Sequence, residues 1–294
     1  MAHGDVSRDV TAAAVTRAAD RTPVRAPATA KINLALVAGR ARQDGRHEVV
    51  TVLQRVDVAD RISLEPAACL TVTGFPQDTL VRAALERLAE LASAEPHWHV
   101  HIEKHIPVAA GLAGGSSDAA TALRLVNGVL GDPLDPEELH ALAASLGADV
   151  PFFLTDGPQL ATGIGTDLAR LALPTDYWVV LVLPDGESKR STAAVYEEFD
   201  RCGGSERFAE RRAALDEALA RVRRPRDLAA LPPNDLASSP LAEELRELGA
   251  FRADVSGAGP AVYGLFVHRQ TAQAARRRLR ARGRTWLTVP AWYG

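Results

Sequence analysis

The stretch PVAAGLAGGSSDAATALRLVN, Pro107 to Asn127, joins a glycine-rich loop to the start of an apolar run. Alanine, leucine and valine recur at helical spacing after the loop, which predicts a helix that begins near Ser116 or Ser117, either of which could cap it. Free backbone N–H groups and the positive end of the helix dipole favour an anion at such a junction, and glycine lets a phosphate approach closely. The stretch therefore predicts a phosphate-binding loop, with a tight strand-to-helix turn as the alternative.

The loop differs from the most common nucleotide-binding patterns. No lysine follows its last glycine, as a Walker A loop requires, and its spacing is not that of the dinucleotide fingerprint GxGxxG. Its small and hydroxyl residues still fall where a phosphate and a metal ion would lie. They are Gly111, Gly114, Gly115, Ser116, Ser117 and Asp118.

A polar pair marks the first strand expected upstream of the loop. In KINLALVAG, apolar Ile32, Leu34 and Leu36 alternate with Lys31 and Asn33. This period of two predicts a half-buried strand with Lys31 and Asn33 on the face opposite the apolar residues. An exposed strand lysine is the alternative to a functional Lys31.

Strands and helices alternate along the chain without an internal repeat. A turn at Asp44-Gly45 leads to His47, near the start of a second strand that is expected to run through Val52. Residues 78–92 have the helical period, and residues 97–107 the strand period. The pattern indicates a mixed α and β architecture.

A carboxylate follows the next helix. Asp135 is expected to cap that helix, with Pro136 at its first position and Glu138 completing a capping box. Gly147 is expected to end it. Asp149 then lies in a turn, where a purely structural role is the alternative to a catalytic one.

Proline is expected to shape the chain directly after this carboxylate. Pro151 should force Val150 into an extended conformation, which places Asp149 between the helix end and the apolar segment PFFL. A phosphate loop, a strand lysine and this carboxylate together match what phosphoryl transfer requires: positioning, charge neutralisation and a proton acceptor.

Composition limits the class of protein. The 294 residues, 47% hydrophobic and 24% charged, suffice for two domains, and a formal net charge of −3 argues against a nucleic-acid partner. The arginine-rich ARRRLRARGR near the C-terminus is interpreted as a solvated helix face. Cys69 and Cys202 are too few for a disulfide framework or a zinc site. With no secretory signal and no apolar run long enough to span a bilayer, we expect a cytoplasmic protein without membrane contact.

Two glycine-rich segments resemble the GHMP small-molecule kinases. PVAAGLAGGSSDAA is similar to their phosphate loop, and DVSGAGPAVYGLF, Asp254 to Phe266, to their C-terminal motif. Within that superfamily, AKINL, DGRHE, LGADVPFFL and NDL resemble the 4-diphosphocytidyl-2-C-methyl-D-erythritol kinase family, which acts in non-mevalonate isoprenoid biosynthesis. The resemblance implies a two-domain α+β fold, with an N-terminal domain like ribosomal protein S5 domain 2 and a ferredoxin-like C-terminal domain.

The resemblance also implies limits for the domains and a monomer or homodimer. We expect residues 1–24 to be a disordered tail, 25–168 the N-terminal domain and 169–294 the C-terminal domain. The active site would lie between the two domains.

The resemblance assigns roles to individual residues. Lys31 and Asp149 would be the catalytic pair, ATP the phosphoryl donor and Mg²⁺ its metal ion, whose protein ligands stay unassigned. Lys104, directly before the loop, is either close to the nucleotide or a solvated strand-end lysine. The residues expected to hold the ATP phosphates are Pro107, Val108, Ala109, Ala110, Gly111, Leu112, Ala113, Gly114, Gly115, Ser116 and Ser117.

The substrate side departs from the family pattern. Asn33, His47, Thr192 and Tyr196 would contact the cytidine diphosphate-linked methylerythritol, with packing roles as the alternative. Arg46 stands where the family commonly has an aromatic residue, although a guanidinium can also stack on a base. A GHMP kinase for another alcohol, such as mevalonate or homoserine, and a catalytically silent nucleotide- or sugar-binding module remain the alternatives.

Overall fold

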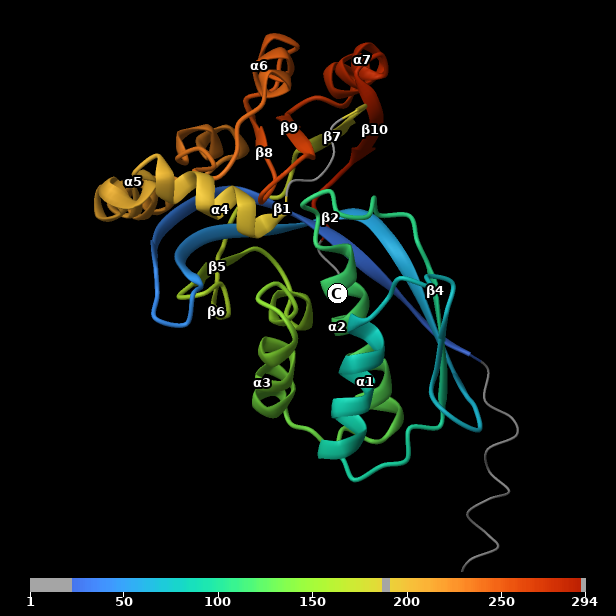
Figure 1. The fold of residues 1–294 in the computed structure, drawn as a ribbon. Helices are drawn as coiled ribbons and strands as arrows, with labels where there is room; N and C mark the ends of the chain where they lie inside the picture. The colour runs from blue at the N-terminus through green and yellow to red at the C-terminus, as the bar shows by residue number, and fades with distance from the viewer. Residues whose placement is uncertain (1–22, 187–190, 292–294) are drawn as a thin grey trace, which may run out of the picture.

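The computed structural model describes residues 23–186 and 191–291, which form two α+β units stacked on either side of a long hairpin (Figure 1). Residues 1–22 of the expected tail lie outside the described residues, and the first strand begins at Val24. Within the described part of the chain, no helix is long and apolar enough to cross a membrane.

The first unit combines one sheet with a layer of helices. Its sheet has the strand order β3-β4-β2-β5-β6, with β1 paired to β2, and only β3 and β4 run parallel. The sheet ends with β6, two residues beyond the predicted domain limit at 168, and both domain limits stay a prediction. The elements are β1 (Val24–Ala41), β2 (His47–Pro66), β3 (Thr71–Thr73), α1 (Leu80–Leu91), β4 (Trp98–Glu103), α2 (Gly114–Val129), α3 (Pro136–Leu146), the 3₁₀ helix η2 (Pro151–Leu154), β5 (Gln159–Thr162) and β6 (Asp167–Arg170).

The second unit has the ferredoxin-like arrangement. Its antiparallel sheet has the order β10-β7-β9-β8, and helices connect β7 to β8 and β9 to β10, as in a βαββαβ unit. The elements are β7 (Trp178–Pro184), α4 (Thr192–Arg201), η3 (Gly204–Arg207), α5 (Phe208–Arg221), η4 (Pro225–Ala230), α6 (Pro240–Glu247), β8 (Arg252–Val255), β9 (Val262–Phe266), α7 (Arg269–Leu279) and β10 (Gly283–Thr288). Arg276, Arg277 and Arg278 lie in the last turn of α7, partly or fully exposed, as expected of a solvated face.

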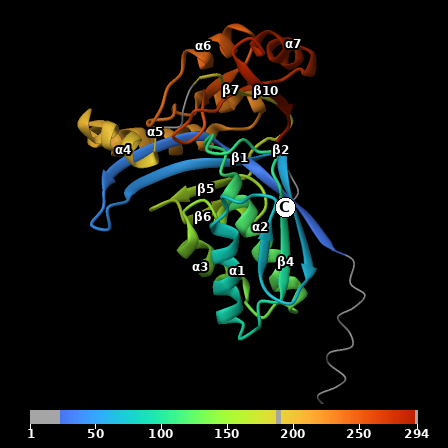
Figure 2. The ribbon, with the colours of Figure 1, turned by 45° about the vertical axis from the view of Figure 1, so that its right-hand side comes forward.

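The hairpin of β1 and β2 lies between the two units. Figures 1 and 2 show α1, α2 and α3 on one side of it and the second unit on the other. Leu53 and Ile62 of β2 pack into a core with the first group of helices, whereas Ile32 and Leu34 of β1 pack into a core with β7 and β9. The expectation of a half-buried strand was therefore wrong: residues 28–39 are buried on both faces because the second unit covers the face left open by the first.

Several local expectations were confirmed. The helix in residues 78–92 and the strand in residues 97–107 are α1 and β4. The capping box at Asp135 and Glu138 is present, and Gly147 ends α3. The second strand begins at His47 and runs through Val52 as expected, and it continues to Pro66.

Two backbone expectations near the site were wrong. Helix α2 begins at Gly114, after Ala113 in the left-handed conformation (φ 55°), and no side chain caps it, so Ser116 and Ser117 lie inside the first turn. Val150 is helical (φ −65°, ψ −45°) rather than extended. Its carbonyl accepts the N–H of Phe153, and this 3₁₀ turn outweighs the preference that a following proline imposes.

Candidate active site

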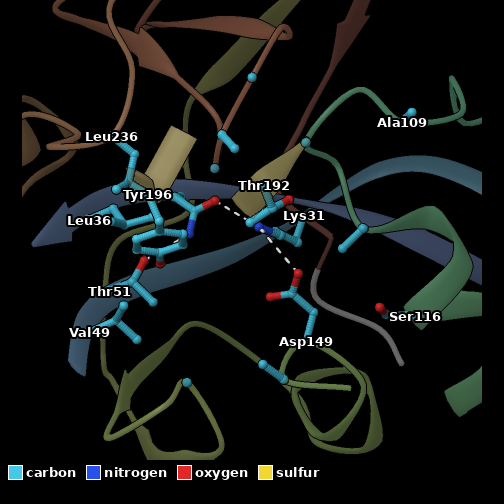
Figure 3. A pocket seen from close by; sticks show the side chains of 18 of the residues that line it. Lys31, Leu36, Val49, Thr51, Ala109, Ser116, Asp149, Thr192, Tyr196 and Leu236 are labelled. Carbon is cyan, nitrogen blue, oxygen red and sulfur yellow. Dashed lines mark hydrogen bonds and ion pairs between the residues drawn. The ribbon is translucent and has the colours of Figure 1, made fainter. Parts of the chain in front are cut away.

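A pocket of about 860 Å³ lies between the two units and carries residues from both. The phosphate loop, the β1–β2 hairpin and the turn after α3 supply its walls on the first unit. Helix α4, Leu236 and the loop at Gly257 supply the walls on the second. Figure 3 shows Lys31 and Asp149 pointing toward each other in the pocket, with Thr192 and Tyr196 beside them.

A lysine and an aspartate face each other in this pocket. Lys31 Nζ lies 3.8 Å from Asp149 Oδ2; the lysine side chain is 5% exposed, whereas the aspartate side chain is 42% exposed. The cation is thus held inside the protein, while the carboxylate stays open to a molecule that enters the pocket. Such a carboxylate can accept a proton from a bound hydroxyl, and the neighbouring cation stabilises the negative charge that develops on the hydroxyl oxygen.

A chain of hydrogen bonds orients Lys31. Its ammonium donates to Asn33 Oδ1 (2.7 Å), Asn33 Nδ2 donates to Thr51 Oγ1 (2.8 Å), and the Thr51 hydroxyl donates to the Ala35 carbonyl (2.7 Å). All three side chains are buried, because the hairpin is covered on both faces. The strand period correctly predicted that Lys31 and Asn33 share a face, but Thr51 comes from the other strand and has no signal in the sequence.

The phosphate loop holds three residues in the left-handed region, at Ala109, Gly111 and Ala113. At Gly111 a Cβ would lie 2.3 Å from the Ser256 carbonyl oxygen, so only glycine fits there. Since no side chain caps α2, the backbone N–H groups of its first turn are left for a ligand. This geometry fits a nucleotide phosphate.

The C-terminal glycine motif clamps this loop from the second unit. Ser256 Oγ donates to the Gly111 carbonyl (3.0 Å), and the N–H of Ala261 donates to the Ala110 carbonyl (3.0 Å). Asn234 Nδ2 in turn donates to the Gly257 carbonyl (2.7 Å). Ser256 and Asn234 were not among the predicted site residues, although the segments DVSGAGP and NDL that contain them stand out in the sequence.

The opposite wall of the pocket is aromatic and acidic. The rings of His47 and Tyr196 stack with centroids 4.3 Å apart, and His47 Nε2 lies 3.0 Å from both carboxylate oxygens of Asp200. Burial, together with the charge of Asp149, raises the pKa of Tyr196 to about 12, so its hydroxyl stays protonated at neutral pH. Asp200 is a site residue that the sequence did not indicate.

A second lysine lies beside the phosphate loop. Lys104 Nζ bonds to Asp60 Oδ2 and, at 2.7 Å, to Asp118 Oδ2, and both carboxylates are buried. Asp60 also accepts the N–H groups of His105 and Ile106, which lead into the loop. The alternative of a solvated strand-end lysine is therefore wrong for Lys104, which is 14% exposed and doubly paired.

Most of the predicted site residues line this one pocket. Leu112 and Ser117 are the exceptions among the loop residues, because both are buried in the protein; the Leu112 carbonyl accepts the Lys31 N–H instead. The predicted residues that line the pocket are Lys31, Asn33, His47, Pro107, Val108, Ala109, Ala110, Gly111, Ala113, Gly114, Gly115, Ser116, Asp149, Thr192 and Tyr196.

Known proteins share this sequence and this architecture. The family model for the GHMP kinases N terminal domain matches residues 79–157, and the model for the GHMP kinases C terminal matches residues 211–285. The 4-diphosphocytidyl-2-C-methyl-D-erythritol kinase of Nocardia farcinica is 41% identical over 261 residues, which cover 81% of this chain and 83% of that protein. The chain belongs to the 4-diphosphocytidyl-2-C-methyl-D-erythritol kinase family.

Solved structures separate this family from its neighbours in the GHMP kinase fold. A crystal structure of 4-(cytidine 5'-diphospho)-2C-methyl-D-erythritol kinase aligns with a TM-score of 0.74 at 32% identity, covering 91% of this chain and all of that one. The mevalonate kinase of Methanococcus jannaschii aligns with a TM-score of 0.72 but at 14% identity, covering 93% of this chain and 99% of that one. The mevalonate kinase thus shares the fold alone, and the predicted two-domain α+β GHMP kinase fold is confirmed.

Proposed function

We propose that this chain transfers the γ-phosphoryl group of ATP to the 2-hydroxyl of 4-diphosphocytidyl-2-C-methyl-D-erythritol, a step of non-mevalonate isoprenoid biosynthesis. The observation that carries the proposal is the Lys31–Asp149 pair. This pair lines the same pocket as His47 and the phosphate loop, and the loop leads into the uncapped start of α2. Family membership supports this choice of alcohol over mevalonate or homoserine.

The proposed reaction is a direct phosphoryl transfer. Asp149 takes the proton of the substrate hydroxyl as its oxygen forms a bond to the γ-phosphorus, and the bond to the bridging oxygen of ADP breaks. Lys31 stabilises the negative charge that develops between hydroxyl, carboxylate and phosphate. Because Asn33 accepts from the same ammonium, it fixes the direction in which Lys31 points.

The loop residues and the start of α2 would bind the phosphates of ATP through backbone N–H groups. When bound together with ATP, Mg²⁺ would neutralise part of the charge of the phosphates. In residues 23–186 and 191–291, no three His, Cys, Asp or Glu side chains lie together as a metal site, and we assign the ion no protein ligand.

The cytidine end of the substrate would lie against His47 and Tyr196, whose stacked rings form the pocket wall beside α4. Arg46 also lines the pocket, where its guanidinium can stack on a base in place of the aromatic residue common in the family. Thr192, in the first turn of the same helix, would contact the substrate near Asp149. The cytoplasmic location and the oligomeric state expected from the sequence stay predictions.

An ADP-release assay with ATP and Mg²⁺ tests the proposal when 4-diphosphocytidyl-2-C-methyl-D-erythritol is run beside mevalonate and homoserine. We expect turnover with the cytidyl alcohol only. Turnover with another alcohol alone would keep the kinase and reject the substrate. No turnover with any of them, together with ATP binding, would instead favour a silent nucleotide-binding module.

A further inference from the structure

A buried arginine connects the strand paired with Lys31 to the segment that follows Asp149. Arg55 on β2 is only 2% exposed, and it stands directly opposite Lys31 in the β1–β2 ladder. Residues directly opposite each other in an antiparallel pair project to the same face of the sheet, so Arg55 is fixed to Lys31 through the hairpin.

The guanidinium of Arg55 is hydrogen-bonded to the segment that follows Asp149. Its Nη2 donates to the carbonyl oxygens of Phe152 (3.3 Å) and Thr155 (2.5 Å) at the end of η2. Its Cζ lies 5.6 Å and 5.7 Å from the ring centroids of Phe152 and Phe153. The contacts therefore hold both the backbone and the side chains of this turn.

The turn that carries Asp149 is itself one hydrogen-bonded unit. The N–H of Val150 donates to the Gly147 carbonyl, and the N–H of Phe153 donates to the Val150 carbonyl. A displacement of Phe152 would therefore be passed back to Asp149. Beyond this turn, no element of the described chain makes a side-chain hydrogen bond to the Arg55 guanidinium or pairs a carboxylate with it within 4.0 Å.

We infer that Arg55 is a positioning residue that sets the separation between Lys31 and Asp149. One end of the bridge is the ladder pair with Lys31, and the other is the pair of carbonyl bonds to the turn after Asp149. Burial, together with the charge of Arg124, lowers the pKa of Arg55 to about 10, which leaves it charged at neutral pH. A charged donor strengthens hydrogen bonds to carbonyl oxygens.

This inference rests on the proposed kinase activity, and its test compares two variants with the wild-type enzyme. Arg55→Met removes the hydrogen bonds to the carbonyl oxygens but keeps an apolar side chain against the rings of Phe152 and Phe153. Asn127→Ala is the matched control, because Asn127 is also buried in the first unit and bonds to the Leu134 carbonyl (2.9 Å), at the end of α2 remote from the phosphate loop. Both variants are assayed for ADP release at a temperature where each is fully folded.

We expect Arg55→Met to lower kcat by about 10- to 100-fold with KM for ATP and for the alcohol within about threefold, since small displacements of reacting groups carry losses of this size. Asn127→Ala should keep kcat within about twofold. Arg55→Lys, which retains a charged donor, should recover at least part of the loss. Equal kcat values for Arg55→Met and Asn127→Ala would overturn the inference. So would a rise in KM as large as the fall in kcat.

Hydrogen exchange supplies a readout that does not depend on turnover. The amide protons of Val150 and Phe153 should exchange about tenfold faster in Arg55→Met than in wild type, and Asn127→Ala should leave them unchanged. Unchanged exchange in Arg55→Met would refute the positioning role of Arg55 even if the wild-type enzyme phosphorylates no alcohol. If the wild type is inactive and exchange is faster in Arg55→Met, the proposed function is rejected, but Arg55 still holds the turn that carries Asp149.

Discussion

Two lysines lie beside the phosphate loop, and their carboxylate partners differ in burial. Lys31 Nζ lies 3.8 Å from Asp149 Oδ2, and the Asp149 side chain is 42% exposed. Lys104 bonds to Asp60 and Asp118, which are 0% and 1% exposed. The same residue types thus make an open pair, whose carboxylate can reach a bound molecule, and a closed triad, whose two carboxylates cannot.

The electrostatics of the closed triad differ accordingly. Burial would lower the pKa of Lys104, but the charges and hydrogen bonds of Asp118 and Asp60 outweigh it and raise the pKa. Burial, together with the charge of Asp60, raises the pKa of Asp118 to about 7, against the opposing effect of Lys104. One cation is therefore shared by two carboxylates that are out of reach of solvent, and its removal would be costly.

The largest effect should come from the open pair. Asp149→Asn removes the proton acceptor with little change in shape, and we expect kcat to fall by roughly 100- to 10,000-fold while ATP affinity changes little. The measurement is steady-state ADP release together with ATP binding by calorimetry. Asp216→Asn, the same change at an exposed position of α5, is the control and should behave as wild type. A kcat within threefold of wild type for Asp149→Asn would remove Asp149 from the chemistry.

Replacing each of the two lysines by methionine tests the comparison directly. Lys104→Met leaves two buried carboxylates without their cation, and we expect the free energy of unfolding to fall by about 3–5 kcal/mol. Lys31→Met leaves an exposed carboxylate and removes the 2.7 Å hydrogen bond to the buried Asn33 amide oxygen, which Ser256 Oγ still reaches at 3.4 Å. The free energy of unfolding should therefore fall by about 1–2 kcal/mol, less than in Lys104→Met, while kcat falls steeply. Urea unfolding and ADP release on both variants provide the measurement. Equal losses of stability in the two variants would contradict the distinction between open pair and closed triad.

The triad should also leave a trace in the pH dependence of stability. The pKa of Asp118 is raised in the folded state above its unfolded value of 3.8, so the folded protein binds more protons between about pH 4 and pH 7. The contribution of Asp118 to stability is therefore full below pH 4 and is lost as pH rises toward 7, by at most about 1.4 kcal/mol per pH unit.

Asp118→Asn isolates this contribution from those of the other titrating groups. The free energy of unfolding of wild type minus that of Asp118→Asn should decrease between pH 4.5 and pH 7.5, as measured by urea titration. A difference that is flat or rises over this range would mean that Asp118 is ionised in the folded protein throughout.

Local signals in the sequence predicted the parts of the site that depend on short-range physics. The capping box at Asp135, the helix end at Gly147 and the loop before α2 all follow from neighbouring residues. The start of α2 was missed because Ala113, rather than a glycine, adopts the left-handed conformation before it. Val150 was missed because the hydrogen bonds of a 3₁₀ turn compete with the effect of Pro151.

Long-range packing accounts for the rest. The sequence period could not show that β1 is buried on both faces, since its second cover is the sheet of β7 and β9, which comes far later in the chain. The approach of Lys31 to Asp149 was implied by family resemblance and by no spacing rule. Thr51, Ser256 and Asp200 join the site only because separate elements meet there.

The smallest predicted effect concerns the pocket wall formed by His47 and Tyr196, where the partner of His47, Asp200, is partly exposed to solvent. His47 Nε2 lies 3.0 Å from the Asp200 carboxylate, which is 45% exposed, so this pair should contribute less than about 1 kcal/mol. We expect Asp200→Asn to raise KM for the cytidyl alcohol up to about fivefold, because His47 is less firmly held against Tyr196, while kcat and KM for ATP stay near wild type.

Steady-state kinetics with each substrate varied in turn measures this, and Glu206→Gln, at an exposed site in η3, serves as the control. A fall in kcat without a change in KM for the alcohol would place Asp200 with the Lys31–Asp149 pair. In that case His47 would act on the reacting hydroxyl rather than on the base, and the two ends of the proposed substrate would be reversed in the pocket. An effect on KM alone would keep the reacting end at the open lysine pair and the base at α4.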